Sequence, residues 1–266
     1  MSLDLPAPVR FRPSSFDGGL PPPGSDLEAA RRVQQHLFPR ELHRLPGWDL
    51  AAVCQPARIV AGDYYDLFEA APGHLAVALG DVAGKGLGPA LVMAGLHAWV
   101  RSRLPHRTAD LPGLVGDLNS YLLASTPDDL FVSLFLAVLD GGTGCLRYVN
   151  AGHPGPILLA ETGREADRLT AGGTVLGAIP GAGYEEGRAA LAPGSVLALF
   201  SDGLTEAASV QGRQFGDQRV LEVLRAARHA PADEIVTRLQ GAVERFQGPA
   251  ARADDLSLVI VRRQAT

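Results

Sequence analysis

Cysteine is scarce in this sequence, with Cys54 and Cys145 the only two in 266 residues. Two cysteines cannot form a disulfide framework, and both lie in apolar, strand-like segments, so we expect buried, reduced thiols. Long apolar runs are also missing, because the longest, Leu130–Leu139, is too short to span a bilayer. The N-terminus has no charged-then-apolar signal pattern. These absences predict a cytoplasmic protein with no membrane segment.

Basic runs are absent as well. The net charge is -5 at pH 7, which argues against nucleic acid or an anionic membrane as a partner. What the sequence does have is length and apolar content, 266 residues of which 46% are hydrophobic. This is enough for one substantial core, and one domain of this size is ordinary for a layered protein of helices and strands.

The chain divides into three parts. Residues 1–24 contain six prolines and no periodic apolar pattern, so we expect an extended tail. Residues 25–39 are predicted to form a helix that begins with a capping box, Ser25 and Glu28, and ends at Pro39. Residues 40–266 carry the motifs described next and form the main domain.

An acidic residue, Asp81, follows an apolar segment that reads as a buried strand, Leu75–Leu79. Four glycines lie within residues 80–88, and Pro89 opens a helix. This loop is not a good phosphate-binding P-loop, because its glycine-to-lysine spacing is one residue short and Gly86 stands where Ser or Thr should hold magnesium. The pattern instead indicates a strand that carries a carboxylate into a tight loop.

Further aspartates have similar surroundings. Asp63, Asp202 and the pair Asp254 and Asp255 each lie at the edge of an apolar or aromatic segment. If these strand ends converge, the carboxylates would repel one another unless hard cations neutralised them. The alternative is that each aspartate only bonds local backbone amides in a turn.

Five ordered motifs then indicate a family. They are Ala-Gly-Asp-Tyr-Tyr-Asp at 61–66, Gly-Asp-Val-Ala-Gly-Lys-Gly at 80–86, Asn-Ala-Gly-His-Pro at 150–154, Ser-Asp-Gly-Leu-Thr-Glu-Ala at 201–207 and Asp-Asp-Leu-Ser at 254–257. The ordered set resembles bacterial SpoIIE-type, RsbU-like protein serine phosphatases of the metal-dependent protein phosphatase 2C (PPM) superfamily. The resemblance runs from about Asp26 to Arg262 and assigns a PPM-type phosphatase domain to residues 40–266.

The periodicity predicts an α+β fold. Strands are expected at residues 50–53, 75–79, 131–139, 145–149, 156–159, 196–200 and 256–261. Helices are expected at residues 89–104, 110–124, 217–228 and 233–246, the first of them buried all round. Residues 63–66 read as an acidic turn, and the strands after residue 131 as antiparallel neighbours. Two antiparallel sheets flanked by helices follow, and the resemblance implies that same four-layer αββα sandwich.

The resemblance also implies two or more Mn²⁺ or Mg²⁺ ions and hydrolysis by attack of metal-bound hydroxide. Asp81 would bridge two metals, Asp63 would hold one, and Asp202 and Asp254 would hold the other, with the backbone carbonyl of Val82 as a further ligand. Oxygen donors of this kind favour Mg²⁺ or Mn²⁺ over zinc.

Four other residues have open roles. Asp255 is the alternative ligand to Asp254, and Asp66 is expected to support the site or the fold. Lys85 would attract the phosphorylated substrate or simply keep its loop solvated. His153 would protonate the leaving group or hold its loop by hydrogen bonds, and the structural role is favoured.

The function expected from the resemblance is a protein serine/threonine phosphatase acting on a phosphorylated anti-sigma factor antagonist of the STAS type. Two alternatives remain: a catalytically silent binding module and a small-molecule phosphomonoesterase. Members of the family often use the segment before the catalytic core to dimerise, so a homodimer through residues 25–39 is one expectation and a helix packed on the core is the other. Because no sensor domain precedes this helix, we expect a separate activator protein.

Overall fold

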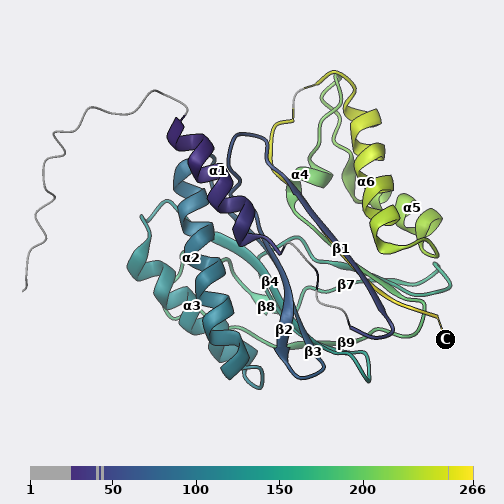
Figure 1. The fold of residues 1–266 in the computed structure, drawn as a ribbon, viewed down its shortest axis with the longest axis horizontal. Helices are drawn as coiled ribbons and strands as arrows, with labels where there is room; N and C mark the ends of the chain where they lie inside the picture. The colour runs from purple at the N-terminus through teal and green to yellow at the C-terminus, as the bar shows by residue number, and fades with distance from the viewer. Residues whose placement is uncertain (1–24, 40–41, 43–44, 251, 266) are drawn as a thin grey trace, which may run out of the picture.

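The computed structural model describes residues 25–39, 42, 45–250 and 252–265 (Figure 1). The tail predicted for residues 1–24 lies outside them. The first described element is helix α1, Ser25–Leu37, which agrees with the helix expected there. None of the described helices is long and apolar enough to cross a membrane.

Two β-sheets stack at the centre of the fold (Figure 1). Sheet A has the order β1 (Trp48–Gln55), β11 (Leu256–Arg263), β10 (Val196–Phe200), β6 (Ile157–Leu159) and β7 (Ala166–Arg168). Sheet B has the order β2 (Tyr64–Ala71), β3 (His74–Val82), β4 (Val132–Asp140), β5 (Cys145–Ala151) and β8 (Gly172–Gly173), and β9 (Gly187–Ala190) also pairs with β5. Among the described strands, the short β5–β8 pair is parallel and the other pairs are antiparallel.

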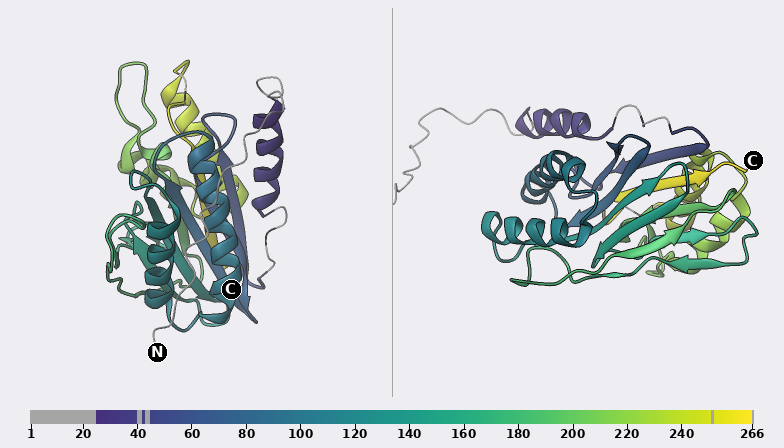
Figure 2. Two further views of the ribbon diagram at one scale, coloured as in Figure 1. Left: turned by 90° about the vertical axis from the view of Figure 1, so that its left-hand side faces the viewer. Right: turned by 90° about the horizontal axis from the view of Figure 1, so that it is seen from below.

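Helices cover both outer faces. Sheet B packs against α2 (Leu87–Arg103) and α3 (Leu111–Ser125), and sheet A packs against α5 (Gly216–Ala227) and α6 (Ala232–Gln247). Helix α1 lies on the outside of α2 (Figure 2), and α4 (Asp202–Thr205) is a single turn after β10. The predicted four-layer αββα sandwich is confirmed.

Strand β3 explains the long apolar run in the sequence. Val77 and Leu79 point into the core between the sheets, whereas Ala76 and Ala78 face the helices on sheet B. A strand covered on both faces has no exposed position for a polar side chain. The first acid, Asp81, therefore comes only where the strand reaches the edge of the sandwich.

The acidic segment at residues 63–66 is not the predicted turn. Strand β2 begins at Tyr64, which pairs with Gly80 of β3, and the chain reverses only after Ala71. The prediction was wrong because Asp66 interrupts the apolar pattern. This carboxylate is fully buried, and Arg101 of α2 compensates its charge.

We had expected strand β6 to pair with the strand before it, β5, but it does not. It crosses to sheet A and pairs with β10, while the edge of β5 pairs with β8 and β9. A three-residue apolar strand carries no local signal for the sheet it joins, because either sheet would bury it.

Two expectations about burial are also wrong. Helix α2 is buried on one face only, since Leu91 is 72% exposed and Leu87 46% exposed. Cys145 is exposed at the start of β5, and Cys54 is partly buried. Apolar composition alone did not show which positions lie at the rim of the fold.

Candidate active site

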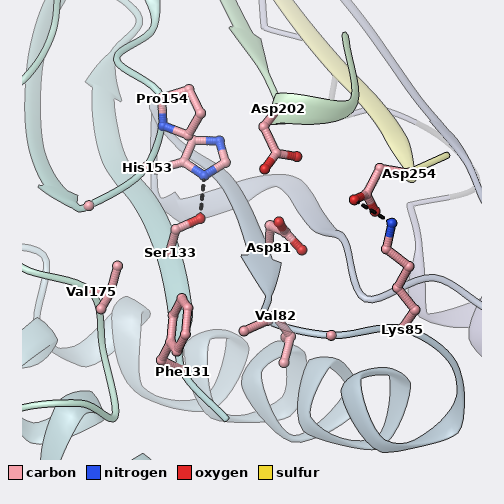
Figure 3. A pocket seen from close by; sticks show the side chains of 13 residues that line it. Asp81, Val82, Lys85, Phe131, Ser133, His153, Pro154, Val175, Asp202 and Asp254 are labelled. Atoms are coloured by element: carbon pink, nitrogen blue, oxygen red, sulfur yellow. Dashed lines mark hydrogen bonds and ion pairs between the residues drawn. The ribbon is translucent and has the colours of Figure 1, made fainter. Parts of the chain in front are cut away.

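A cleft of about 570 Å³ opens at one edge of the two sheets. Three predicted site aspartates line it: Asp81 at the end of β3, Asp202 after β10 and Asp254 before β11. Their carboxylates point toward a common space (Figure 3). Residues far apart in the sequence are thus brought together at one rim.

The antiparallel pairing of β10 with β11 places Asp202 near Asp254, because one strand ends where the other begins. Gly203 allows the close approach of these two segments. A Cβ at this position would lie 1.9 Å from the backbone oxygen of Asp255. Only glycine fits at so short a distance.

Asp63 and Asp81 are both held in an unfavourable electrostatic environment. Asp63 is 1% exposed, and its Oδ2 has no hydrogen-bond partner in the described part of the chain. Burial raises the pKa of Asp63 well above its usual value, and Asp81 raises it further. The pKa of Asp81 is raised to about 7, first by burial and then by Asp202 and Asp254. These carboxyl groups lack the positive charge that would favour their ionised form.

Lys85 places one ammonium group in the cleft. Its Nζ lies 2.7 Å from Oδ2 of Asp254 (Figure 3). It also donates a hydrogen bond to the backbone oxygen of Ala253. Burial and Asp254 nevertheless raise the pKa of Asp202, although Lys85 acts to lower it. A single ammonium therefore does not balance the acidic residues.

Asp255 is turned away from the cleft. Its Oδ1 accepts a hydrogen bond from the backbone N–H of Ala57 and its Oδ2 accepts one from Gly62, both at 2.7 Å. Gly62 in turn leaves room beside the site, because a Cβ there would lie 3.1 Å from the carbonyl oxygen of Val82 and 3.8 Å from Oδ1 of Asp81. Asp255 thus fixes the loop ahead of β2, whereas its neighbour in the sequence faces the cleft.

His153 lines the cleft beside Ser133, a residue that the sequence analysis did not identify. The His153 Nδ1 lies 2.9 Å from the Ser133 Oγ. Asn150 holds the histidine backbone from both sides, accepting from its N–H at 2.8 Å and donating to its carbonyl at 3.0 Å. Ser133 is the cross-strand neighbour of Asp81, and only a prediction that these two strands pair, which we did not make, could have found it.

The His153 imidazole is neutral, because burial lowers its pKa to about 3. The unfolded state takes up a proton near pH 6.5 and the folded state does not, so stability is present above that pH and is lost as the pH falls. From pH 7 to pH 5 we expect this group to lower the free energy of unfolding by about 2 kcal/mol. Denaturant unfolding of the wild type and His153→Gln at both pH values measures it. Equal pH dependence in the two proteins would contradict the prediction.

Asp66, the second acid of the first motif, lies outside the cleft lining. Its carboxylate is fully buried and receives two hydrogen bonds from Arg101, each 2.7 Å long. The backbone N–H of Leu67 donates to it as well. Asp66 therefore joins sheet B to α2, which agrees with the structural role that the sequence analysis allowed.

We expect Arg101→Met to lower the free energy of unfolding by about 2–3 kcal/mol, because it leaves a buried carboxylate without its cation. The loss is smaller than for a fully buried pair because the Arg101 side chain is 40% exposed. Activity of the folded protein should change less than about two-fold, since a residue outside the cleft affects no reacting group. Chemical denaturation and steady-state kinetics test both parts, and Arg103→Met, the same change two residues further on at the exposed end of α2, is the control.

The donors at this site suit a hard divalent cation. They are the carboxylates of Asp63, Asp81, Asp202 and Asp254 and the carbonyl of Val82. Mg²⁺ and Mn²⁺ prefer oxygen ligands of this kind. In the described residues, no three acidic, histidine or cysteine side chains are already arranged to hold an ion, so binding would draw the carboxylates together. The buried, unpartnered oxygen of Asp63 and the raised carboxyl pKa values show that positive charge fits here.

Two sheets between helix pairs, with carboxylates at one edge, define the fold of PP2C phosphatase domains. The SiaA-PP2C domain of Pseudomonas aeruginosa superposes with a TM-score of 0.80 at 22% identity, covering 90% of this chain and 96% of that one. The Stage II sporulation protein E (SpoIIE) family model matches residues 71–264. The chain belongs to the SpoIIE family, and the resemblance inferred from its motifs is confirmed.

Two curated relatives are similar over most of this chain. Protein IcfG of Synechocystis sp. is 29% identical over 264 residues, which are 90% of this chain and 41% of IcfG. Phosphoserine phosphatase RsbU of Bacillus subtilis is 27% identical over 242 residues, 90% of this chain and 70% of RsbU. The chain thus spans less than half of the first relative and about two thirds of the second.

Proposed function

We propose that this protein is a metal-dependent protein serine/threonine phosphatase. The observation that carries the proposal is the convergence of Asp81, Asp202 and Asp254 on one cleft, with Asp63 buried beside them and their charges unbalanced. Divalent cations would neutralise such a cluster. Similarity to a phosphoserine phosphatase, RsbU, supports the same reaction.

Two Mn²⁺ or Mg²⁺ ions would be held by the four carboxylates and the Val82 carbonyl. Asp81 would contribute to holding both ions, because it raises the pKa of Asp63 and its own pKa is raised by Asp202 and Asp254. Asp254 is the ligand rather than Asp255, whose oxygens are committed to backbone amides. When bound, the ions would activate a water and neutralise the phosphoryl oxygens.

The chain's own residues would bind and orient the phosphoryl group. Lys85 attracts its negative charge, and its three N–H donors suit phosphoryl oxygens. Ser133, the cross-strand neighbour of Asp81, offers a hydroxyl held in place by His153. A neutral His153 does not act as a general acid near pH 7, so its role is to orient Ser133.

The rim of the cleft supports a protein rather than a metabolite as substrate. Phe131 lines the cleft and is 44% exposed, and Val175 and Pro154 line the same side. An exposed apolar surface next to an anion site suits contact with a folded protein that carries a phosphorylated side chain. The proposed substrate is a phosphorylated STAS-type regulator, consistent with the RsbU relationship.

Helix α1 is proposed to be a regulatory segment to which an activator protein or a second copy of the chain binds. Gln34 of α1 is buried and exchanges two hydrogen bonds with the backbone of Ala61, at 2.8 and 2.9 Å. Ala61 lies two residues before Asp63. A shift of α1 would therefore be transmitted directly to a proposed metal ligand.

The test of the proposed function is hydrolysis of an aryl phosphate and of a phosphoserine peptide by metal-stripped protein. We expect no turnover in chelator and restored turnover with Mn²⁺ or Mg²⁺. Activity that persists in chelator would contradict the metal requirement. Metal binding without turnover of either substrate would favour the silent binding module, and a strong preference for small phosphomonoesters would favour the metabolite enzyme.

A further inference from the structure

Lys85 is the only lysine in the chain. The chain has 24 lysine and arginine residues, and all of them except Lys85 are arginines. Arginine and lysine are often exchanged on exposed surfaces, but they differ in chemistry: guanidinium binds carboxylates through a fixed, two-pronged fork, whereas ammonium is a compact point charge. The one position that keeps an ammonium lies in the candidate active site.

The backbone directs this lysine across the cleft. Gly84 and Gly86, on either side, have φ values of 95° and 99°, a region that other residues rarely adopt. Between them Lys85 reaches a segment 168 residues further along the chain, where it contacts the Asp254 carboxylate and the Ala253 carbonyl. The loop after β3 and the entry to β11 are thereby joined.

The ammonium occupies a carboxylate oxygen that the proposed metal would also use. Nζ lies 2.7 Å from Asp254 Oδ2, within the range of a charge-assisted hydrogen bond. An ionised carboxylate can accept more than one partner, but a divalent ion at about 2.0–2.2 Å from it would lie close to the ammonium, and two positive charges so near repel each other. The ammonium and the divalent ion therefore compete at Asp254.

We propose that Lys85 is a displaceable internal counterion of Asp254: it competes with a divalent cation for this carboxylate, and cation binding releases its ammonium into the cleft. This inference rests on the proposed metal-dependent function. The released ammonium can then bind the phosphoryl group. The same side chain would thus compensate the charge of Asp254 when no metal is bound and bind substrate when metal is bound.

Lysine suits such an exchange better than arginine does. The side chains of Lys85 and Asp254 are 38% and 39% exposed, so their ion pair is screened by water and weak. A divalent cation can displace it. An arginine would bind the carboxylate through two hydrogen bonds, and a divalent cation would displace it less readily.

Calorimetric titration of Mn²⁺ into the metal-stripped protein tests the competition directly. Lys85→Met should bind Mn²⁺ about two- to five-fold more tightly than the wild type, the range expected for removing an exposed ion pair. Lys85→Arg should bind it more weakly, although its charge is unchanged. Arg58→Met controls for a general loss of positive charge near the loop, since the Arg58 Nη1 lies 3.9 Å from where a Cβ on Gly86 would be.

The Asp254→Asn background separates competition at this carboxylate from general electrostatics. There, the additional Lys85→Met change should leave Mn²⁺ affinity unaltered, because the residue for which the charges compete is gone. Equal affinities of the wild type and Lys85→Met would overturn the inference, and so would the same gain in the Asp254→Asn background or in Arg58→Met. Each of these results leaves the proposed phosphatase function standing, whereas a wild type that binds no Mn²⁺ overturns both.

A second measurement uses the uniqueness of this lysine. Amine-selective labelling followed by peptide mass spectrometry reports on one side chain only. We expect Lys85 to label faster when the protein is saturated with Mg²⁺, because its ammonium leaves Asp254. Slower or unchanged labelling with Mg²⁺ bound would overturn the release step.

Discussion

Replacing Asp81 with asparagine should reduce metal-dependent hydrolysis by about 10³-fold or more. Asp202 and Asp254 raise the pKa of Asp81, and Asp81 raises the pKa of Asp63, so Asp81 interacts with all the other proposed carboxylate ligands. A bound metal stabilises transition-state charge by several kcal/mol, and each 1.4 kcal/mol is worth about tenfold in rate. Turnover of an aryl phosphate at saturating Mn²⁺ measures the loss.

Asp129→Asn is the matched control for this prediction. Asp129 lies in an exposed loop outside the cleft lining, and the same chemical change there should leave turnover within about two-fold. In chelator at pH 8, Asp81→Asn should unfold at a higher temperature than the wild type, because it removes one of several carboxylates that repel one another. Retained activity would refute the central position of Asp81, and a lower unfolding temperature would refute the repulsion.

Gly203→Ala should damage both the fold and the reaction, although it adds only one methyl group. The new Cβ would lie 1.9 Å from the Asp255 backbone oxygen, so the segments before β11 and after β10 must separate. Overpacking of this kind costs about 3 kcal/mol. The shift moves Asp202 and Asp254 apart, and a displacement of about 1 Å can cost 10²-fold in rate. Chemical denaturation and kcat at saturating Mn²⁺ measure the two losses.

The control is Gly116→Ala on α3, where a Cβ would have no other heavy atom within 4 Å. That change should be neutral or stabilising by up to about 1 kcal/mol, because alanine favours a helix more than glycine does. A Gly203→Ala protein as stable and active as the wild type would show that the contact with Asp255 is not required.

The sequence by itself determined most of the architecture. Apolar runs identified the strands around Val77 and Leu136, and their spacing from turns and helices predicted the layered fold. The acidic residues at strand ends predicted a shared site, since antiparallel strands return their ends to the same edge. These features are encoded locally, by side-chain periodicity and by residues that stop a strand.

Other features depended on contacts between distant segments. Asp254 faces the cleft and Asp255 does not, because two backbone amides from the loop ahead of β2 hold Asp255. Asp66 looked like part of a turn, yet Arg101, 35 residues further on, lets it lie buried in a strand. In both cases neighbouring residues leave two arrangements open.

The same reason explains what was missed or left open at the site. Ser133 becomes a site residue only through strand register and the buried His153, and the role of Lys85 follows from a carboxylate 169 positions away in the numbering. The sequence determines which side chains are available and which secondary structure each segment forms. Tertiary packing decided which charges meet, because a charge far along the chain has a defined partner only when the chain brings the two together.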